Sequence, residues 1–170
     1  MQAEGFPPIA EPAAKVLILG TLPGQLSLER GEYYAQPRNS FWRLMSDIFG
    51  IAADLPYSTR TQRLTGHGVA VWDVCKAAYR SGSLDASIRA GSEQQNDFIT
   101  FYREHRSIQL VCFNGAKAAA MYREKVLGEL PREFKEIRSA VLPSTSAAHA
   151  AMRYEDKLKR WSIVREQCET

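Results

Sequence analysis

The side chains best suited to chemistry follow short apolar runs of the sequence. Asn114 closes the run Ser107–Gly115, and its amide can offer one donor and one acceptor to a ligand, although an Asn-Gly pair is also a common turn. Three hydroxyl residues in a row, Ser144–Ser146, follow the last such run. Hydroxyls and free N–H groups at this kind of position either hold a phosphate or cap a helix.

A second unusual stretch is GTLPGQLSLERGEYYAQPRNSFW, which runs from Gly20 to Trp42 behind an apolar segment. It carries four large aromatic residues: Tyr33, Tyr34, Phe41 and Trp42. A connection that only reverses the chain does not need them, so they are either core residues or part of a binding site. Asn39 has an ordinary explanation too, as the N-cap of a following helix. Taken together, these features predict that the stretch forms one wall of a pocket for a nucleotide.

The elements that would position these groups are four β-rich runs and the helical patterns between them. The runs are Lys15–Gly20, Gly68–Val74, Ser107–Gly115 and Ser139–Ser144. Three of them are continuously apolar, which is typical of strands buried on both faces of a parallel sheet. Helical patterns occur at Phe41–Gly50, Asn96–His105, Ala116–Leu127 and around Leu158–Val164. This alternation predicts an α/β fold, a three-layer α/β/α sandwich with a central four-stranded parallel sheet.

A parallel sheet of this kind fixes where the chemistry must lie. Ligands bind beyond the carboxyl ends of the strands, so the segments that follow the four strands should converge. These segments read GTLPG, WDV, FNG and LPSTS.

The composition limits the class of protein. A length of 170 residues with 45% hydrophobic and 24% charged residues is typical of one folded domain. We expect a partly loose N-terminal arm at residues 1–14 and a single domain at residues 15–170. The sequence has no apolar run of about 20 residues and no signal pattern at its start, which argues against a membrane and favours the cytoplasm.

The cysteines and histidines argue against a disulfide framework and against a metal. Cys75, Cys112 and Cys168 are isolated, with no C-x-x-C motif, and the three histidines have no partners at ligand spacing. The net charge of +3 is only mildly basic. We therefore expect no metal and no cofactor.

The combination of GTLPG, YYAQPRNSFW, FNG and LPSTSAAHA resembles the uracil-DNA glycosylase superfamily. Within it, the chain is most similar to the hypoxanthine-DNA (deoxyinosine) glycosylase branch, followed by the mismatch-specific uracil and thymine glycosylases. The resemblance covers most of the chain from Val16 onward. It implies a DNA repair enzyme that flips a deaminated base out of DNA and hydrolyses its N-glycosidic bond, leaving an abasic site.

The resemblance also implies roles for residues at the base. In the mismatch-specific relatives the third place of the first motif holds a catalytic asparagine, but this chain has Leu22 there. In the deoxyinosine branch the asparagine of PRNSFW serves instead, which makes Asn39 the expected catalytic residue, orienting a water. Tyr34, with Phe113 as second choice, is the expected stacking platform for the base, and Asn114 the expected reader of its edge. The expected base pocket comprises Gly20, Thr21, Leu22, Pro23, Gly24, Tyr34, Phe113 and Asn114.

The loop after the last strand matches the part of the family that grips DNA phosphates and enters the minor groove. Relatives place an intercalating arginine in this loop where the present chain has Ala148, which leaves His149 or Met152 as the expected wedge. The expected DNA contacts are Arg38, Pro143, Ser144, Thr145, Ser146, His149, Arg153 and Lys157. Lys159 and Arg160 are further candidates for phosphate contacts.

Three functions follow from these expectations. The first is a glycosylase that removes hypoxanthine, the second is the same chemistry on uracil or on mismatched thymine, and the third is a weakly catalytic protein that binds abasic or damaged DNA. No lysine in the motifs is placed to form a Schiff base, which predicts a monofunctional hydrolase. We expect a monomer whose partner is DNA with a deaminated base, in the cytoplasm and associated with the nucleoid.

Overall fold

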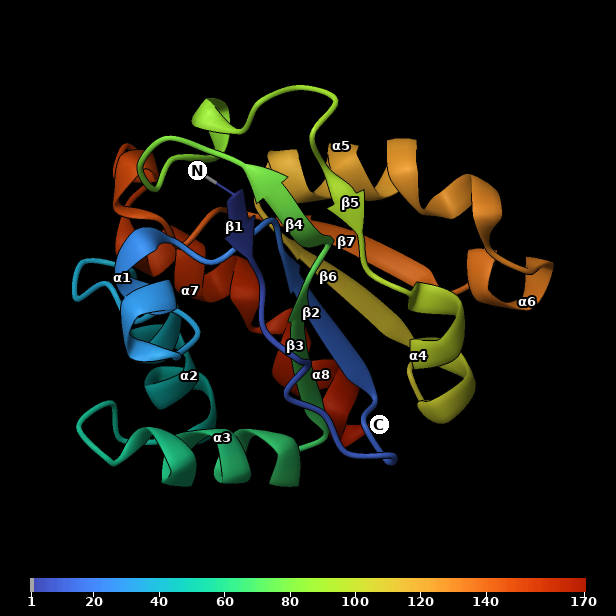
Figure 1. Cartoon of the computed structure of the whole chain (residues 1–170). Coiled ribbons are helices and arrows are strands. Elements are labelled where there is room, and N and C mark those ends of the chain that lie inside the picture. The colour runs from blue at the N-terminus through green and yellow to red at the C-terminus, as the bar shows by residue number, and fades with distance from the viewer. Residues whose placement is uncertain (1) are drawn as a thin grey trace.

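The computed structural model describes residues 2–170, and its centre is a four-stranded sheet (Figure 1). The strands are β2 (Val16–Gly20), β3 (Val69–Asp73), β6 (Leu110–Asn114) and β7 (Arg138–Leu142). Their order is β3-β2-β6-β7, and every neighbouring pair is parallel. The predicted central parallel sheet is therefore confirmed, with each strand inside or within one residue of its predicted run.

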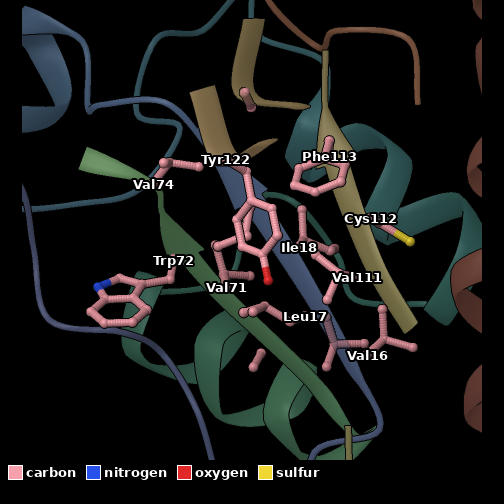
Figure 2. Packing of buried hydrophobic residues seen from close by; sticks show 14 of the residues in the cluster. Val16, Leu17, Ile18, Val71, Trp72, Val74, Val111, Cys112, Phe113 and Tyr122 are labelled. Carbon is pink, nitrogen blue, oxygen red and sulfur yellow. The ribbon is translucent and has the colours of Figure 1, made fainter. Parts of the chain in front are cut away.

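The burial of these strands explains their composition. All residues of β2, β3 and β6 are buried, whereas β7 lies at an edge and exposes Arg138, Ser139 and Val141. β3 lies at the other edge, but Ile9 forms a backbone bridge with Val71 and covers it. Side chains of the three buried strands form the core cluster seen in Figure 2.

Helices cover both faces of the sheet, which confirms the three-layer α/β/α prediction. Those described are α1 (Gln25–Arg30), α2 (Phe41–Phe49), α3 (Tyr57–Gly66), α4 (Phe98–Glu104), α5 (Ala116–Lys125), α6 (Arg132–Lys135), α7 (Tyr154–Trp161) and α8 (Ile163–Glu169). On one face, α4 and α5 contact the sheet through Trp72 with Phe98 and Phe113 with Tyr122. On the other face, α2 and α7 meet through Phe41 and Trp161. Successive side chains of a strand point to opposite faces of the sheet, so the position of a residue in its strand decides which helical layer its side chain meets.

A second, smaller sheet was not predicted. It is antiparallel, in the order β1 (Gln2–Glu4), β4 (Cys75–Tyr79) and β5 (Gln94–Gln95), and β4 continues from β3 after a single residue.

This small sheet corrects the expectation of a partly loose N-terminal arm. Residues 2–4 pair with β4, and the Gly5 amide donates to the Lys76 carbonyl at 2.8 Å. Further along, the Trp72 indole donates to the Phe6 carbonyl at 3.1 Å. The segment is held because its backbone completes the edge of one sheet and covers the edge of another. The domain boundary at residue 15 remains a prediction.

No helix among residues 2–170 has both the length and the apolar character to cross a membrane.

Candidate active site

A cavity of about 630 Å³ lies at the carboxyl end of the central sheet. Residues from all four predicted strand ends line it, namely Gly20, Asp73, Asn114 and Ser144. Residues of the stretch between β2 and α2 complete one side, and residues 83–86 and 144–149 complete the rim. The convergence predicted from the parallel sheet is thus present in the structure.

The floor of the cavity requires the glycine that ends β2. A Cβ atom placed on Gly20 would lie 2.6 Å from Asp73 Oδ1, closer than a Cβ atom packs, and 3.0 Å from Tyr34 Oη, which is a tight contact. Thr21 and Leu22 follow and also line the cavity, although Leu22 is 6% exposed. Only glycine therefore lets the Asp73 and Tyr34 head groups approach the same point.

Tyr34 is the aromatic residue of the stretch that is held in an unusual conformation. Its φ of 57° lies in the left-handed region, which a non-glycine residue rarely adopts. The following amide, of Ala35, donates to Ser27 Oγ at 3.1 Å and fixes the turn. One face of the Tyr34 ring stacks on Phe41, with 4.1 Å between centroids. The Tyr34 hydroxyl is buried and makes no hydrogen bond of normal geometry among the described residues. Burial, followed by the charge of Asp73, raises its pKa, and the nearby Asn114 amide opposes this effect.

The other aromatic residues of the stretch belong mainly to the core. Tyr33, Phe41 and Trp42 are at most 6% exposed. The Trp42 indole donates to the Tyr33 carbonyl at 3.0 Å, which ties the turn to α2. Three of the four rings therefore have a structural role, and Tyr34 is presented to the cavity by them, with Tyr33 contributing at its edge.

Asn39 lines the same cavity and lies one residue before Ser40, the N-cap residue of α2, which corrects the N-cap alternative for Asn39. Its Oδ1 nevertheless accepts a hydrogen bond from the Phe41 amide, the first of the helix, at 3.0 Å. The side chain keeps its Nδ2 donors and a second Oδ1 lone pair, because an amide can make more than one hydrogen bond. The bond to Phe41 thus fixes the orientation of Asn39 without using all of its polar groups.

Asn114 and Thr145 satisfy each other. Asn114 Nδ2 donates to Thr145 Oγ1 at 2.9 Å, and the Thr145 amide donates to Asn114 Oδ1 at 2.9 Å. The Thr145 carbonyl in turn accepts from the Ser40 amide at 2.9 Å. This pair joins β6, the loop after β7 and the start of α2, so much of the Asn114 amide is committed to positioning the loop.

Two acidic residues of the cavity were not among the predicted site residues. Asp73, at the end of β3, is 4% exposed, and its Oδ2 has no hydrogen-bond partner among residues 2–170. Burial, with a smaller contribution from the charge of Asp85, raises the pKa of Asp73 to about 8 against the opposing effect of Arg80. Asp85 accepts a hydrogen bond from Thr21 Oγ1 at 2.9 Å, and burial raises its pKa too. The WDV strand end predicted the place of Asp73, whereas no sequence signal marked Asp85.

Phe113 does not line the cavity, which corrects its assignment to the base pocket. Its neighbour Asn114 points to the α2 face, so Phe113 points to the opposite face, as strand geometry requires. There it packs against Tyr122 of α5, with 5.1 Å between centroids (Figure 2).

Two of the predicted DNA contacts also need correction. Thr145 is 1% exposed and is held by Asn114, so its side chain does not face a phosphate. Lys157 is 5% exposed, and burial lowers its pKa. Pro143 is half-buried, its carbonyl accepts from the Trp161 indole at 2.9 Å, and its contact with DNA stays a prediction.

The remaining predicted contacts lie on or near the rim. Ser144, Ser146 and His149 line the cavity. Ser146 Oγ also accepts from the Ala148 amide at 3.3 Å, as the helix-capping alternative predicts. Arg38 and Arg153 are exposed and lie outside the lining. Within the described chain, no group of three or more His, Cys, Asp or Glu side chains is arranged to hold a metal ion.

Comparison with known proteins agrees with this geometry. The profile of the Uracil DNA glycosylase superfamily matches residues 7–165. A protein of Methanosarcina acetivorans named hypoxanthine DNA glycosylase is 37% identical over 165 residues, covering 96% of this chain and 98% of the relative. One of the same name from Methanosarcina barkeri is 35% identical over 141 residues, covering 82% and 87%.

A solved structure supports the same conclusion. The solution NMR structure of a proposed uracil DNA glycosylase from Methanosarcina acetivorans superposes with a TM-score of 0.83 at 33% identity, and all of each chain is covered. The chain belongs to the uracil DNA glycosylase superfamily. It is accordingly a DNA N-glycosylase, as its motifs predicted.

Proposed function

We propose that this glycosylase removes hypoxanthine from DNA, hydrolyses the N-glycosidic bond and leaves an abasic site. The observation that carries the proposal is that Asn39, Tyr34 and the four strand ends line one cavity of about 630 Å³. A cavity of this size suits a single small ligand. Both named relatives, which match most of the chain, bear the name hypoxanthine DNA glycosylase.

The cavity can hold only a base that has left the helix. Extrusion costs a few kcal/mol, and less for a mismatched or damaged base. Stacking on an aromatic face returns about 1–3 kcal/mol. Because Phe41 covers one face of Tyr34, the base would stack on the other face, and the strained backbone of Tyr34 would hold the ring ready for it.

Asn39 is the proposed catalytic residue. Its bond to the Phe41 amide fixes the side chain, and its free amide hydrogens or remaining lone pair would orient a water toward the sugar. Leu22 lines the same cavity but cannot polarise water. Hydrolysis then needs no covalent intermediate, which is consistent with a monofunctional enzyme.

The rim would contact DNA. Ser144, Ser146 and His149 lie at the cavity, and Arg38 and Arg153 are exposed. Basic side chains bind phosphates without sequence preference. His149 or Met152, both exposed, would fill the space that the base leaves. We further propose that the enzyme acts as a monomer in the cytoplasm, at the nucleoid.

The test uses duplexes that carry hypoxanthine, uracil or a G·T mismatch, treated with the enzyme and then with hot alkali to cleave abasic sites. Strand breaks with the hypoxanthine duplex, well above those with the other two, support the proposal. Breaks mainly with uracil or the mismatch would replace it with the second function. Tight binding without breaks in any duplex would indicate a damage-binding protein.

The role of Asn39 is tested separately. Asn39→Ala should lower turnover by about 100-fold or more, on the scale of one well-placed catalytic group, while the fold persists. Loss of the bond to the Phe41 amide alone costs about 1 kcal/mol of stability. Asn39→Ser is the control, because a serine hydroxyl can also accept a bond from the start of a helix but is too short to replace the amide. If Asn39→Ser restores turnover, the residue only supports the helix.

A further inference from the structure

The Asp73 carboxyl is the least explained polar group of the molecule. It lies at the cavity floor beside Gly20, is 4% exposed, and leaves Oδ2 without a hydrogen-bond partner among the described residues. Buried carboxylates are normally hydrogen-bonded or paired with a cation. A group that departs from this rule inside a cavity is a candidate for contact with the ligand.

The charged and titratable groups around Asp73 come from three neighbouring segments. They are Asp85 on the short helix at residues 85–87, Cys75 on β4 with Arg80 directly after it, and Tyr33 and Tyr34 before α2. Asp85 itself is faced by Lys117 and His149. Among these groups, Arg80 is the cation that lowers the pKa of Asp73, and its effect opposes those of burial and of Asp85.

Arg80 does not neutralise Asp73 through an ion pair. Its guanidinium donates to the carbonyls of Leu22, Pro23 and Gly82. Asp85 is held by Thr21, and its bond to that hydroxyl favours the ionised form. With a pKa of about 8, Asp73 is mainly a neutral acid at neutral pH, and a neutral carboxyl can donate a proton. Two neighbouring carboxyls in different environments are typical of divided acid and base roles.

We propose that Asp73 is the general acid of the reaction and donates its proton to an acceptor atom of the extruded purine as the glycosidic bond breaks. The inference rests on the proposed function, because it requires a deaminated purine in the cavity. Asp73 and Asn39 line the same cavity, so one can face the base while the other faces the sugar. The missing Cβ of Gly20 lets Asp73 Oδ1 lie close to the end of β2, while Asp73 Oδ2 has no hydrogen-bond partner among the described residues.

The step balances within the substrate, one water and Asp73. The C1′–N9 bond breaks, and its electron pair stays with the base. The Asp73 proton passes to a ring nitrogen or to O6, so the base departs neutral. Water adds its hydroxide to C1′, and its other proton returns to the Asp73 carboxylate. The products are the abasic sugar and free hypoxanthine, with the acid regenerated.

The experiment measures single-turnover excision of hypoxanthine from a duplex by wild-type enzyme and by Asp73→Asn, across the neutral and alkaline range. The wild-type rate should fall as the pH rises through about 8, because the acid is then ionised. Asp73→Asn, which has the same shape but no acid proton, should be slower by about 100-fold or more and lose this alkaline fall. Affinity for a duplex with a non-cleavable 2′-fluorinated deoxyinosine should stay close to that of wild type.

A second substrate separates proton transfer from simple hydrogen bonding. In DNA, N7-methylated deoxyinosine carries a formal positive charge on its imidazole ring, and its base leaves as neutral 7-methylhypoxanthine without an acid, so Asp73→Asn should excise it at close to the wild-type rate. If Asp73→Asn keeps the wild-type rate and the alkaline fall on hypoxanthine, or if it loses affinity and not turnover, the acid role is overturned.

Asp85→Asn provides a test that does not depend on the folding of Asp73→Asn. It keeps an acceptor for Thr21 but removes the negative charge that raises the pKa of Asp73, so the alkaline fall should move to lower pH. An unmoved fall contradicts the inference. Failure of the proposed function would instead appear as no excision of hypoxanthine by the wild-type enzyme. Failure of this inference alone leaves wild-type excision intact and appears in the pH profile and in the variants.

Discussion

The two walls of the cavity treat their buried polar groups in opposite ways. On the wall made by β6 and the loop after β7, Asn114 and Thr145 satisfy each other with two hydrogen bonds of 2.9 Å. On the wall made by β2, β3 and the turn before α2, Asp73 Oδ2 and the Tyr34 hydroxyl have no partner among residues 2–170. We call these the paired wall and the unpaired wall.

The difference separates residues that hold the shape of the cavity from residues whose polar groups are available to a ligand. A buried polar group without a partner costs about 1–3 kcal/mol, so an unpaired wall lowers stability unless a ligand supplies the missing bonds. The paired wall holds the loop after β7 against the sheet, and the unpaired wall leaves polar groups that a ligand in the cavity can bind. Substitutions on the paired wall should therefore act mainly on stability, and those on the unpaired wall mainly on activity.

The largest effect is expected on the paired wall. Asn114→Ala leaves the Thr145 amide and hydroxyl buried without partners, and we expect the free energy of unfolding to fall by about 3 kcal/mol. Urea denaturation measures it. Ser144→Ala is the control from the same loop, because Ser144 is only half-buried and its hydroxyl accepts one bond, from the Ser146 amide. Equal losses in the two variants would contradict the special role of the pair.

Gly20→Ala, on the unpaired wall, should lower turnover by about 100-fold, which is the cost of a displacement of about 1 Å at a catalytic site. The new Cβ would lie 2.6 Å from Asp73 Oδ1 and displace that carboxyl. Gly66→Ala, in α3 and outside the cavity lining, is the control, because its new Cβ would meet no atom within 4 Å. Single-turnover excision of hypoxanthine gives both rates, and a fully active Gly20→Ala would refute the assignment of this wall.

Asp73→Asn should raise the melting temperature at neutral pH by about 2 °C or more. The wild-type pKa is about 8 when folded and 3.8 when unfolded, so folding takes up a proton and wild-type stability falls as the pH rises between these values. Asparagine has no such linkage. The gain should thus be small near the lower value and reach its maximum above the higher one. Calorimetry at several pH values tests this, and a gain independent of pH would count against a neutral Asp73.

The smallest effect is expected from Leu22→Asn. This variant places an amide where mismatch-specific relatives have their catalytic asparagine, on the unpaired wall. We expect weak but detectable release of uracil from a G·U duplex, measured against wild-type enzyme and against Leu22→Met as an apolar control. No release from any of the three would mean that this position does not face the sugar.

The sequence predicted the central sheet because strands buried on both faces, such as β2, β3 and β6, are continuously apolar. It did not predict the small sheet, since β4 follows β3 after one residue and β5 has two residues, too few for a pattern. Helix α2 was predicted from its spacing. Helix α3 was not, because Leu64 is its only fully buried residue and the apolar period is lost.

The candidate site was predicted in outline for a similar reason. Parallel strands bring their carboxyl ends together whatever their residues, so the cavity could be placed from four loops. The use of each side chain depends on partners far away in the chain. Asn114 is engaged by Thr145, and Thr21 by Asp85, at separations of 31 and 64 residues. No local pattern records such pairs.

Residues near the N-terminus contact the wall of the cavity through Tyr33. The Tyr33 hydroxyl donates to the Pro7 carbonyl at 3.1 Å, and Phe6 packs edge-on against the same ring at 5.1 Å between centroids. Tyr33 immediately precedes Tyr34, the residue with the strained backbone that lines the cavity. The N-terminal segment therefore supports the cavity wall from the side away from the cavity. Proteolytic removal of this segment would loosen that wall, and a tag is better attached at the C-terminus.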